Sequence, residues 1–531
     1  MSPFHYIFWL VAYATGIYVP YVLLTHLFHL ALHPLRHYPG PFIAKLSDFY
    51  GGYLALSRRA HLAQWQNHLQ YGPIVRYGPD RLIFNSVTAL RDIYQNPRIT
   101  KSHAYLAAWT NNSLNIFSTI DEDMHRRKRK VVQQPISGRS MRTFEPTMLV
   151  QIDIFLRQIY SSSLDSDPVN MTERCERLGI DIVGHLAFGY SLNLQTEETY
   201  RFLPGALALG KTRINACMSF LALKKVDWIL KYFGRRQRTM VLDMLNKMIV
   251  SRVAQDAHAK HDFYSFAVGN LNGGSPNDIE NSELWAEATF FITAGGTPPA
   301  TTMCALLFYL SRNPRCYGRL AEEVRSTFQL GSEIKGGSKL QGCVYLRACI
   351  DESLRLAPPN LGVLWREQAK DDDDNTPLVI DGHVIPSGTQ FAVSIYSIHH
   401  NEEYFPDAFA FQPERWLVPT TPESQEQQAI RERMHKAFVP FIVGPRACAG
   451  KSMTYLEVSL VLAKILWYFD FKPAAGEPGG VGGDQPGRTD GRDRADEYQL
   501  FDVFNSAHDG PYLMFEARAG VAGDLSKTGV E

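Results

Sequence analysis

The chain is 531 residues long and carries 54 Lys and Arg against 54 Asp and Glu, so its formal net charge is zero. This balance gives no electrostatic reason to expect nucleic acid as a partner. Hydrophobic residues make up 45% of the chain, which is ordinary for a globular protein. The seven cysteines are irregularly spaced and form no CxxC pair, which argues against a disulfide framework or a structural zinc site.

The N-terminal segment, 1–33, contains no Asp, Glu, Lys or Arg. Within it, 6–32 is apolar and longer than the roughly 20 residues that cross a bilayer, and Pro20, His26 and His29 are tolerated there. A cleaved signal peptide is the alternative, but the basic n-region is missing and the apolar run is too long. We therefore predict a single-pass transmembrane anchor in the endoplasmic reticulum membrane, with the body on the cytosolic side because basic residues follow the anchor.

Three prolines in 34–42 fix the backbone and prevent the helix from continuing, which predicts a stiff, proline-rich elbow. The body, 43–520, has mostly helical patterns. Short strand-like segments interrupt it at 74–76, 81–84 and 378–380.

Two long helices are predicted in the second half of the body, one over 283–310 and one after Gly450. The segment 474–496 is rich in Gly, Asp, Arg and Pro, which predicts a disordered surface insert. A strand-like pair follows at 498–504 and 511–515, and 521–531 forms a tail. The predicted fold class is mainly α with small β-sheets.

Cys448 lies in a loop that opens into a helix, where residues 441–450 read Phe-Ile-Val-Gly-Pro-Arg-Ala-Cys-Ala-Gly. Amide groups of such a loop and of a helix N-terminus favour the thiolate over the thiol. Gly450 permits close approach of a flat ligand, and Arg446 offers a charge for an acidic group beside it. A thiolate in an open loop suits a metal porphyrin. The alternative is a buried core cysteine after a glycine turn.

This loop resembles the Phe-x-x-Gly-x-Arg-x-Cys-x-Gly motif of the cytochrome P450 superfamily, matched at Phe441, Gly444, Arg446, Cys448 and Gly450. The resemblance implies the cytochrome P450 fold and a haem b cofactor held by these residues, with Cys448 as the axial ligand of the iron. It also implies monooxygenase activity.

Glu352 and Arg355 stand three residues apart, so they can pair on one helix face. The later segment Phe-Gln-Pro-Glu-Arg-Trp resembles the family's meander, whose arginine is Arg415 here. The resemblance implies a buried charge network of these three residues. Loss of one partner would leave an uncompensated charge, at a cost of roughly 3–5 kcal/mol.

His125 and Arg129 match the two positions of the family's propionate-binding helix, with histidine in place of tryptophan. Their spacing of four residues places both on one helix face, where they could meet haem carboxylates. The alternative is a solvated basic helix that docks a reductase, and we prefer it for the neighbouring basic residues Arg126, Arg127, Lys128 and Lys130.

The clearest departure from the family lies at 294–302, which reads Ala-Gly-Gly-Thr-Pro-Pro-Ala-Thr-Thr. The family has an acid where Thr297 stands and an alcohol where Pro298 stands, and this pair normally delivers protons to dioxygen. The two prolines leave two helix carbonyls without amide partners, and these carbonyls can hold water. Our hypothesis is that Thr297 or Thr301, with that water, replaces the relay. In the alternative, the prolines set a kink and the threonines bond to backbone.

The resemblance places seven mainly apolar residues at the substrate cavity, which suits a lipophilic small molecule entering from the membrane. These residues are Tyr105, Trp109, Phe117, Phe291, Leu361, Val363 and Phe504. The chain has no flavin or ferredoxin-like module, so an NADPH–cytochrome P450 reductase is the expected electron donor.

The expected reaction is hydroxylation or epoxidation, and the sequence looks most like fungal enzymes of secondary-metabolite biosynthesis. Because the acid and alcohol are missing, four alternatives stay open. The enzyme could catalyse a rearrangement, a dehydration or a coupling, or the chain could be a non-catalytic haem binder. A haem-free membrane scaffold is a further rival, which the Cys448 motif argues against.

Overall fold

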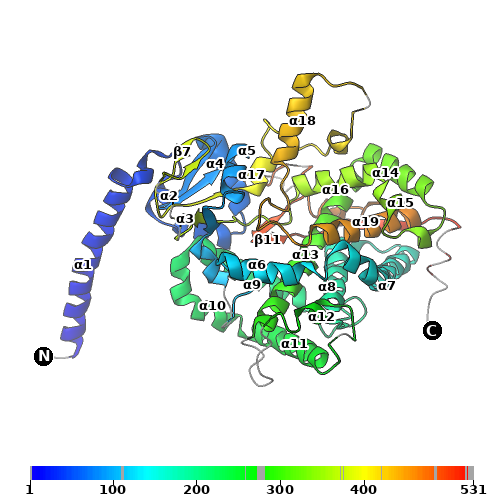
Figure 1. The fold of residues 1–531 in the computed structure, drawn as a ribbon, viewed down its shortest axis with the longest axis horizontal. Coiled ribbons are helices and arrows are strands. Elements are labelled where there is room, and N and C mark those ends of the chain that lie inside the picture. The colour runs from blue at the N-terminus through cyan, green and yellow to red at the C-terminus, as the bar shows by residue number, and fades with distance from the viewer. Residues whose placement is uncertain are drawn as a thin grey trace.

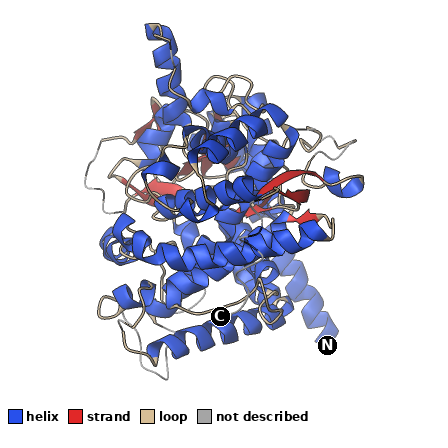
Figure 2. Cartoon of the chain, turned by 90° about the vertical axis from the view of Figure 1, so that its right-hand side faces the viewer, coloured by secondary structure: helices blue, strands red, loops and turns tan. Residues whose placement is uncertain are grey.

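The computed structural model describes residues 3–108, 113–257, 259–271, 282–370, 372, 374, 376–419, 421–483, 487–488, 490–494, 496–520, 523 and 525; for 3–15 and 230 it describes the backbone only. Within these residues the chain is mainly α-helical with small β-sheets, which confirms the predicted fold class (Figures 1 and 2).

Helix α1 (Pro3–Ala31) stands apart from the rest of the molecule in Figure 1. Among the described residues, no helix combines the length and the apolar character needed to cross a bilayer. The transmembrane span predicted over 1–33 is therefore not confirmed, and the polar residues Thr25, His26 and His29 lower the mean hydropathy of α1. The helix ends before the elbow, where η1 (Pro34–His37) forms a single short turn.

Most of the body is helical. Its helices before the cysteine loop are α2 (Phe42–Leu46), α3 (Phe49–Leu56), α4 (Ala60–Tyr71), α5 (Val87–Tyr94), α6 (Glu122–Gln133), α7 (Gly138–Leu164), α8 (Met171–Phe188), α9 (Leu203–Ser219), α10 (Asp227–Phe233), α11 (Arg235–Val253), α12 (Phe263–Ala267), α13 (Glu283–Arg312), α14 (Pro314–Thr327), α15 (Ser338–Gln341), α16 (Val344–Leu356), α17 (Ile395–His399) and α18 (Gln425–Ala437). After the loop come α19 (Lys451–Tyr468) and α20 (Glu477–Gly480), and the 3-10 turns of the body are η2 (His103–Ala108), η3 (Leu221–Val226), η5 (Gly331–Glu333) and η6 (Pro413–Trp416).

The largest sheet has the strand order β1-β2-β8-β5-β3, in which only the β2–β8 pair is parallel. A smaller sheet has the order β4-β12-β9, and β6–β7 and β10–β11 are two-stranded. The strands are β1 (Ile74–Gly78), β2 (Arg81–Phe84), β3 (Ile99–Lys101), β4 (Val169–Asn170), β5 (Arg366–Gln368), β6 (Val379–Ile380), β7 (His383–Val384), β8 (Gln390–Val393), β9 (Phe469–Pro473), β10 (Phe501–Val503), β11 (Asn505–Ala507) and β12 (Tyr512–Ala517).

Helix α13 runs through the centre of the body and is buried over most of its length. Its N-terminus is capped by Ser282, whose side chain accepts a hydrogen bond from the Trp285 amide at 3.1 Å. The helix contains Pro298 and Pro299 without ending there. The prediction of a long helix in this region is confirmed.

Helix α8 lies against α13 at unusually close range because glycines face each other. A Cβ on Gly179 of α8 would overlap the carbonyl oxygen of Gly296, and a Cβ on Gly295 would meet Val183 at 2.6 Å. Only residues without a side chain fit at this crossing. The contact fixes the position of α8 relative to the central helix.

Two predictions concern the C-terminal region. The disordered insert predicted over 474–496 stays a prediction: Arg492 is 2% exposed and Arg494 covers the ring of Trp65 at 4.4 Å, whereas 475–478 are exposed. Arg492 and Arg494 thus cover aromatic rings of the body. The strands predicted over 498–504 and 511–515 exist but do not pair with each other, because β10 pairs with β11 and β12 pairs with β9 and β4.

Candidate active site

A cavity of about 380 Å³ lies between α13, α6, α9 and the loop that carries Cys448, and its walls are largely apolar. Aromatic residues, the two prolines of α13 and the cysteine loop contribute to the lining. No acidic side chain among the described residues lines it, whereas six basic residues do: Lys101, His125, Arg129, Lys211, Arg366 and Arg446.

The cysteine loop is a tight turn held by its own backbone. The amide of Cys448 donates to the carbonyl oxygen of Phe441 at 2.9 Å, and the amide of Ala447 donates to Gly444 at 3.0 Å. Gly444 has a φ of 82°, and a Cβ there would overlap the carbonyl oxygen of Tyr94. Glycine is therefore required at this position for two reasons. Gly450, the N-cap of α19, completes the turn.

Cys448 is the exposed member of the seven cysteines, and the other six are buried. Its side chain lines the cavity, and a Cβ on Gly450 would lie 3.9 Å from its Sγ. The side chain is open to the cavity but removed from bulk water by the surrounding protein, and this desolvation raises the pKa of the Cys448 thiol, although the amides of Gly450 and Lys451 and the charge of Arg129 lower it. This net direction differs from the prediction that the loop alone favours the thiolate, because desolvation outweighs the amide groups.

Five of the basic residues form a group that we call the cation cluster: Lys101, His125, Arg129, Arg366 and Arg446. Burial lowers the pKa of Lys101 well below its ordinary value, and the charges of Arg446 and Arg366 lower it further. Burial and the charges of Lys101 and Arg446 lower the pKa of His125 to about 2, so its imidazole is neutral near neutral pH. Burial and the charge of Arg366 lower the pKa of Arg446 to about 10. Neighbouring positive charges thus disfavour the protonated forms of Lys101, His125 and Arg446.

Strand pairing brings two of these cations directly opposite each other. Lys101 of β3 faces Arg366 of β5 across an antiparallel pair. Like charges in this position destabilise a sheet, and within the described part of the chain no carboxylate lines the cavity to offset them. An anionic ligand would offset the repulsion. The two carboxylates of a haem fit this requirement, and Cys448 offers a sulfur donor in the same cavity, so the residues present fit a haem group.

Two arginines tie the cysteine loop to the start of α6. Arg446 donates to the carbonyl oxygens of Thr119 and Ile120, at 3.3 and 2.8 Å. In the reverse direction, Arg129 of α6 donates to the carbonyl oxygen of Ala447. The cavity wall that holds Cys448 and the wall that holds His125 are therefore fixed relative to each other.

Beside the cavity, the structure brings Glu352, Arg355 and Arg415 into one buried network. Arg355 donates to both carboxylate oxygens of Glu352, at 2.8 and 2.9 Å, and Arg415 donates at 3.1 Å. The amide of Gln412 and the indole of Trp416 add bonds at 3.0 and 2.9 Å. Burial raises the pKa of Glu352, but the two arginines more than offset this, so its pKa lies below the ordinary value.

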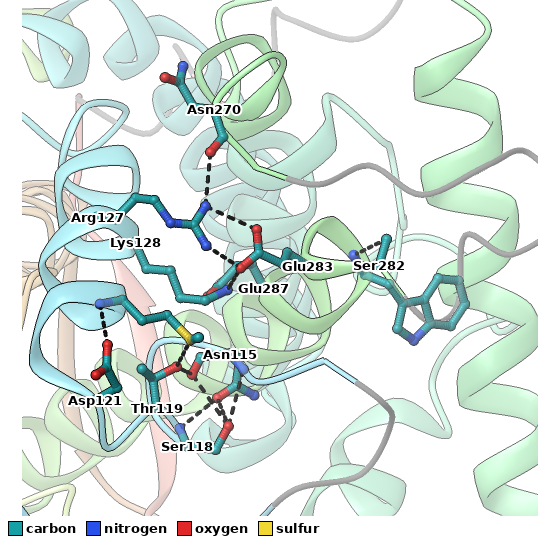
Figure 3. A network of polar contacts seen from close by, with 12 residues as sticks. Asn115, Ser118, Thr119, Asp121, Arg127, Lys128, Asn270, Ser282, Glu283 and Glu287 are labelled. Atoms are coloured by element: carbon teal, nitrogen blue, oxygen red, sulfur yellow. Dashed lines mark hydrogen bonds and ion pairs between the residues drawn. The ribbon is translucent and has the colours of Figure 1, made fainter.

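The basic residues beside Arg129 are not all solvated, which corrects one prediction. Lys128 is fully buried and lies 3.1 Å from both Glu287 and Glu283 of α13. Arg127 also pairs with Glu283, at 2.5 Å (Figure 3). Helix amphipathicity explains the difference, since Lys128 lies on the face of α6 that meets α13. Arg126 is exposed and pairs with Glu122 and Asp123 of its own helix.

Thr297 and Thr301 do not line the cavity, whereas Pro298 and Pro299 do. Both threonines are almost fully buried. Lys211 donates to the hydroxyl of Thr297 at 2.5 Å. Thr301 donates to the carbonyl oxygen of Thr297 at 3.3 Å and accepts from Ser506 at 3.1 Å. Thr301 thus makes the backbone contact that the alternative reading predicted.

Four of the predicted cavity residues line it: Tyr105, Phe117, Phe291 and Phe504. Trp109 lies outside the described residues. Leu361 and Val363 do not line the cavity, because the amides of Leu361 and Gly362 both donate to the carbonyl oxygen of Phe504 and turn Asn360 and Leu364 toward it.

Sequence reasoning missed three basic residues of the cavity, Lys101, Arg366 and Lys211. No local motif marks them. Pairing of β3 with β5 brings the first two together, and packing of α9 on the body brings the third. A charged residue inside an otherwise apolar segment was the available signal for Lys211, which stands in the α9 sequence Leu-Ala-Leu-Gly-Lys-Thr.

Known proteins similar to this chain point to one family. The model of the Cytochrome P450 family matches residues 45–479. The cytochrome P450 monooxygenase AKT7 of Alternaria alternata is 31% identical over 504 residues, which cover 93% of this chain and 95% of that protein. The monooxygenases atnE of Emericella nidulans and apf7 of Gibberella fujikuroi are 31% and 32% identical and cover 94% and 95% of their own lengths.

Proposed function

The chain belongs to the cytochrome P450 family and is a monooxygenase of that family, and from this premise we propose that it hydroxylates or epoxidises a lipophilic small molecule with haem b bound through Cys448. We assign the substrate to fungal secondary metabolism, because the relatives named above are fungal enzymes. The electrons come from NADPH through a separate cytochrome P450 reductase.

One observation carries the proposal: the side chain of Cys448 opens into a cavity whose wall holds the cation cluster and no carboxylate among the described residues. This arrangement matches a flat ligand with a metal at its centre and carboxylates at its edge. When bound, haem would supply the redox-active iron at which dioxygen is reduced.

The chain's own residues have three tasks in this proposal. Cys448 would provide the sulfur ligand, and the cation cluster would bind the haem carboxylates. The apolar lining accepts a lipophilic substrate. The two prolines of α13 leave the carbonyls of Ala294 and Gly295 without helical amide partners, so these oxygens are free to hold water in the cavity.

A second candidate follows from the departure at Thr297 and Pro298. An enzyme that catalyses rearrangement, dehydration or coupling needs less proton delivery than a hydroxylase, and a non-catalytic haem binder needs none. Hydroxylation or epoxidation predicts oxygenated product, whereas these alternatives predict haem binding without it. Comparison of metabolites after deletion of the gene identifies the substrate and separates these cases.

Replacement of Cys448 tests the assignment directly. We expect the reduced carbon monoxide difference spectrum of the wild-type protein to show a thiolate-type Soret band, and Cys448→Ser to lose both the band and NADPH-dependent turnover. Cys316→Ser, which removes a buried sulfur elsewhere, should keep both. An unchanged spectrum in Cys448→Ser would overturn the proposal.

We also propose that the protein associates with the endoplasmic reticulum membrane. The support is a set of exposed apolar side chains on α1 and on helices of the same side of the body in Figure 1. They include Leu23, Leu24 and Leu27 of α1, Phe49 of α3 and Trp228 of α10. Carbonate extraction of the full chain should leave it in the membrane pellet, and recovery in the supernatant would contradict this part of the proposal.

A further inference from the structure

Lys211 differs from the other basic residues of the cavity in its partners. It comes from α9 and donates a hydrogen bond of 2.5 Å to the hydroxyl of Thr297 on α13. It is 5% exposed, yet its side chain lines the cavity. The cation cluster meets the expected haem carboxylates, so Lys211 is a buried ammonium group with a different task.

Glu176 of α8 is the acidic residue whose charge acts on Lys211. The glycine contact between α8 and α13 fixes its position, because Glu176 lies one turn before Gly179. Glu176 is half-buried, whereas Lys211 and Thr297 are buried. The carboxylate makes no direct ion pair with Lys211, so water would connect the two groups. Exposure thus decreases from Glu176 to Lys211, whose side chain lines the cavity.

We propose that Lys211 delivers protons from solvent into the cavity, with Thr297 holding the ammonium group in position and Glu176 restoring each proton that Lys211 gives up. This inference rests on the proposed function and deepens it, since it names the residues that replace the missing acid and alcohol. Thr297 is then a positioning residue, and Thr301, held by Ser506 and by backbone, takes no part.

The step balances with the reactants of a monooxygenase. Lys211 transfers a proton to a water molecule or a reduced oxygen species in the cavity and becomes a neutral amine. Glu176 then gives its proton to Lys211 through water and recovers one from solvent. For each dioxygen, NADPH supplies two electrons, one oxygen atom enters the substrate, and the other leaves as water after taking up two protons.

The protonation equilibria suit this transfer. Burial raises the pKa of Glu176 to about 7, with Lys211 opposing, and burial lowers the pKa of Lys211 to about 8, with Glu176 opposing. Both groups therefore exchange protons near neutral pH. The charged neighbours of Glu176 include Glu173 and Arg177. His508 is a titratable neighbour of Lys211, but burial and the charge of Lys211 lower its pKa to about 3, so it stays neutral.

The first test uses the full chain with bound haem, the reductase and NADPH, without added substrate. Under these conditions reduced dioxygen leaves as peroxide or as water, and water needs the further protons that Lys211 supplies. Lys211→Met should slow water formation by roughly 100-fold, the low end of the effect of a positioned proton donor, and raise peroxide per dioxygen consumed. Lys211→Arg should recover part of the loss.

The matched control is Lys464→Met, which removes another buried lysine, one that pairs with Asp153 at 3.1 Å outside the cavity. It should leave the ratio of peroxide to water unchanged. In the wild type, water formation should fall as pH rises through the pKa of Lys211, because the ammonium group loses its proton. Glu176→Gln should move this fall to lower pH, since loss of the negative charge favours the neutral amine.

A second readout does not depend on turnover. Trace labelling of lysines with acetic anhydride at a series of pH values, read peptide by peptide by mass spectrometry, gives the titration of Lys211 itself. Its midpoint should lie below that of exposed lysines and fall further in Glu176→Gln. An ordinary midpoint that Glu176→Gln does not change would overturn the proposal.

Two other outcomes are informative. If Lys211→Met weakens binding of dodecanoate but leaves the peroxide ratio and its pH dependence unchanged, Lys211 anchors an acidic substrate and the proton-delivery proposal is wrong. If the wild-type protein shows the thiolate-type band but oxidises no NADPH with the reductase, the proposed function fails before Lys211 is tested. The two failures are therefore distinguishable.

Discussion

The Glu352 network and the cation cluster are both built from buried charges, but their charges balance differently. Glu352 accepts hydrogen bonds from two arginines, one indole and one amide, so its negative charge is fully met within the chain. In the cation cluster, Lys101 and Arg366 oppose each other across two strands, and none of the residues that the structure describes brings a carboxylate to the lining of their cavity.

The difference separates a structural network from a binding site. A buried charge set that is complete within the protein stabilises the folded chain in any state of ligation. A set that contains one sign only destabilises the empty protein and stabilises the complex with an anion. Loss of a charge should therefore lower the free energy of unfolding in the Glu352 network and raise that of the haem-free protein in the cation cluster.

The largest effect is expected in the Glu352 network. Glu352→Ala should lower the free energy of unfolding by roughly 3–5 kcal/mol, because it leaves two buried arginines without a counter-charge. Urea unfolding measures this loss. Glu173→Ala, at a surface pair with Arg177, is the control and should cost about 0–1 kcal/mol. Equal losses in the two variants would contradict the structural role of the network.

The same network predicts how the stability of the folded protein changes with pH. The folded-state pKa of Glu352 lies below its ordinary value, so its contribution to stability is present at neutral pH and is lost as the pH falls through the folded-state pKa. Glu352→Ala should therefore show a weaker acid dependence of unfolding than the wild-type protein.

A smaller effect is expected for Lys101→Gln, and in the haem-free protein it should be a gain of stability rather than a loss. Glutamine keeps an amide donor for the carbonyl oxygens of Ile116 and Phe117 but removes the charge that faces Arg366. The haem-free protein should gain about 1 kcal/mol in urea unfolding, and haem affinity should fall about tenfold, or about 1.4 kcal/mol, in a spectroscopic titration.

Lys464→Gln is the control for Lys101→Gln, because the positive charge of Lys464 is paired with Asp153. It should destabilise the empty protein slightly and leave haem affinity unchanged. If Lys101→Gln behaved in the same way, the cation cluster would be a structural network like the one around Glu352.

The smallest effect is expected for Thr301→Val. The variant loses the hydrogen bond from Ser506 and the bond to the carbonyl oxygen of Thr297, which together cost about 1 kcal/mol of stability. The peroxide released per dioxygen should stay the same, because Thr301 does not reach the cavity. A rise in peroxide equal to that of Lys211→Met would place Thr301 in the proton path instead.

Local sequence was sufficient where a function resides in one short segment. The loop around Cys448 needs glycine at 444 for a positive φ and at 450 to begin α19, and both needs can be read from the motif. The partners of Glu352 could be named because Arg355 lies on the same helix face and Arg415 lies in a recognisable segment. The helical class and the short strands at 74–76 and 81–84 follow from residue patterns.

Other features depended on contacts between distant segments. Composition could not show that Arg492 and Arg494, within the segment 474–496, cover aromatic rings of other elements. The helical pattern of α6 could not show that Lys128 meets two glutamates of α13 rather than solvent (Figure 3). Thr297 was a candidate relay in the sequence, and the structure instead placed a lysine of α9 against it.

By itself, the sequence determined the helical fold class, the tight cysteine loop and the family to which the chain belongs, because each is encoded in residues close together in the chain. Tertiary structure decided which buried charges are balanced within the chain and which need a bound anion for balance. This depends on strand pairing and helix packing between residues that lie far apart in the sequence. The proton donor of the cavity belongs to the second group, because Lys211, Glu176 and Thr297 lie on three different helices.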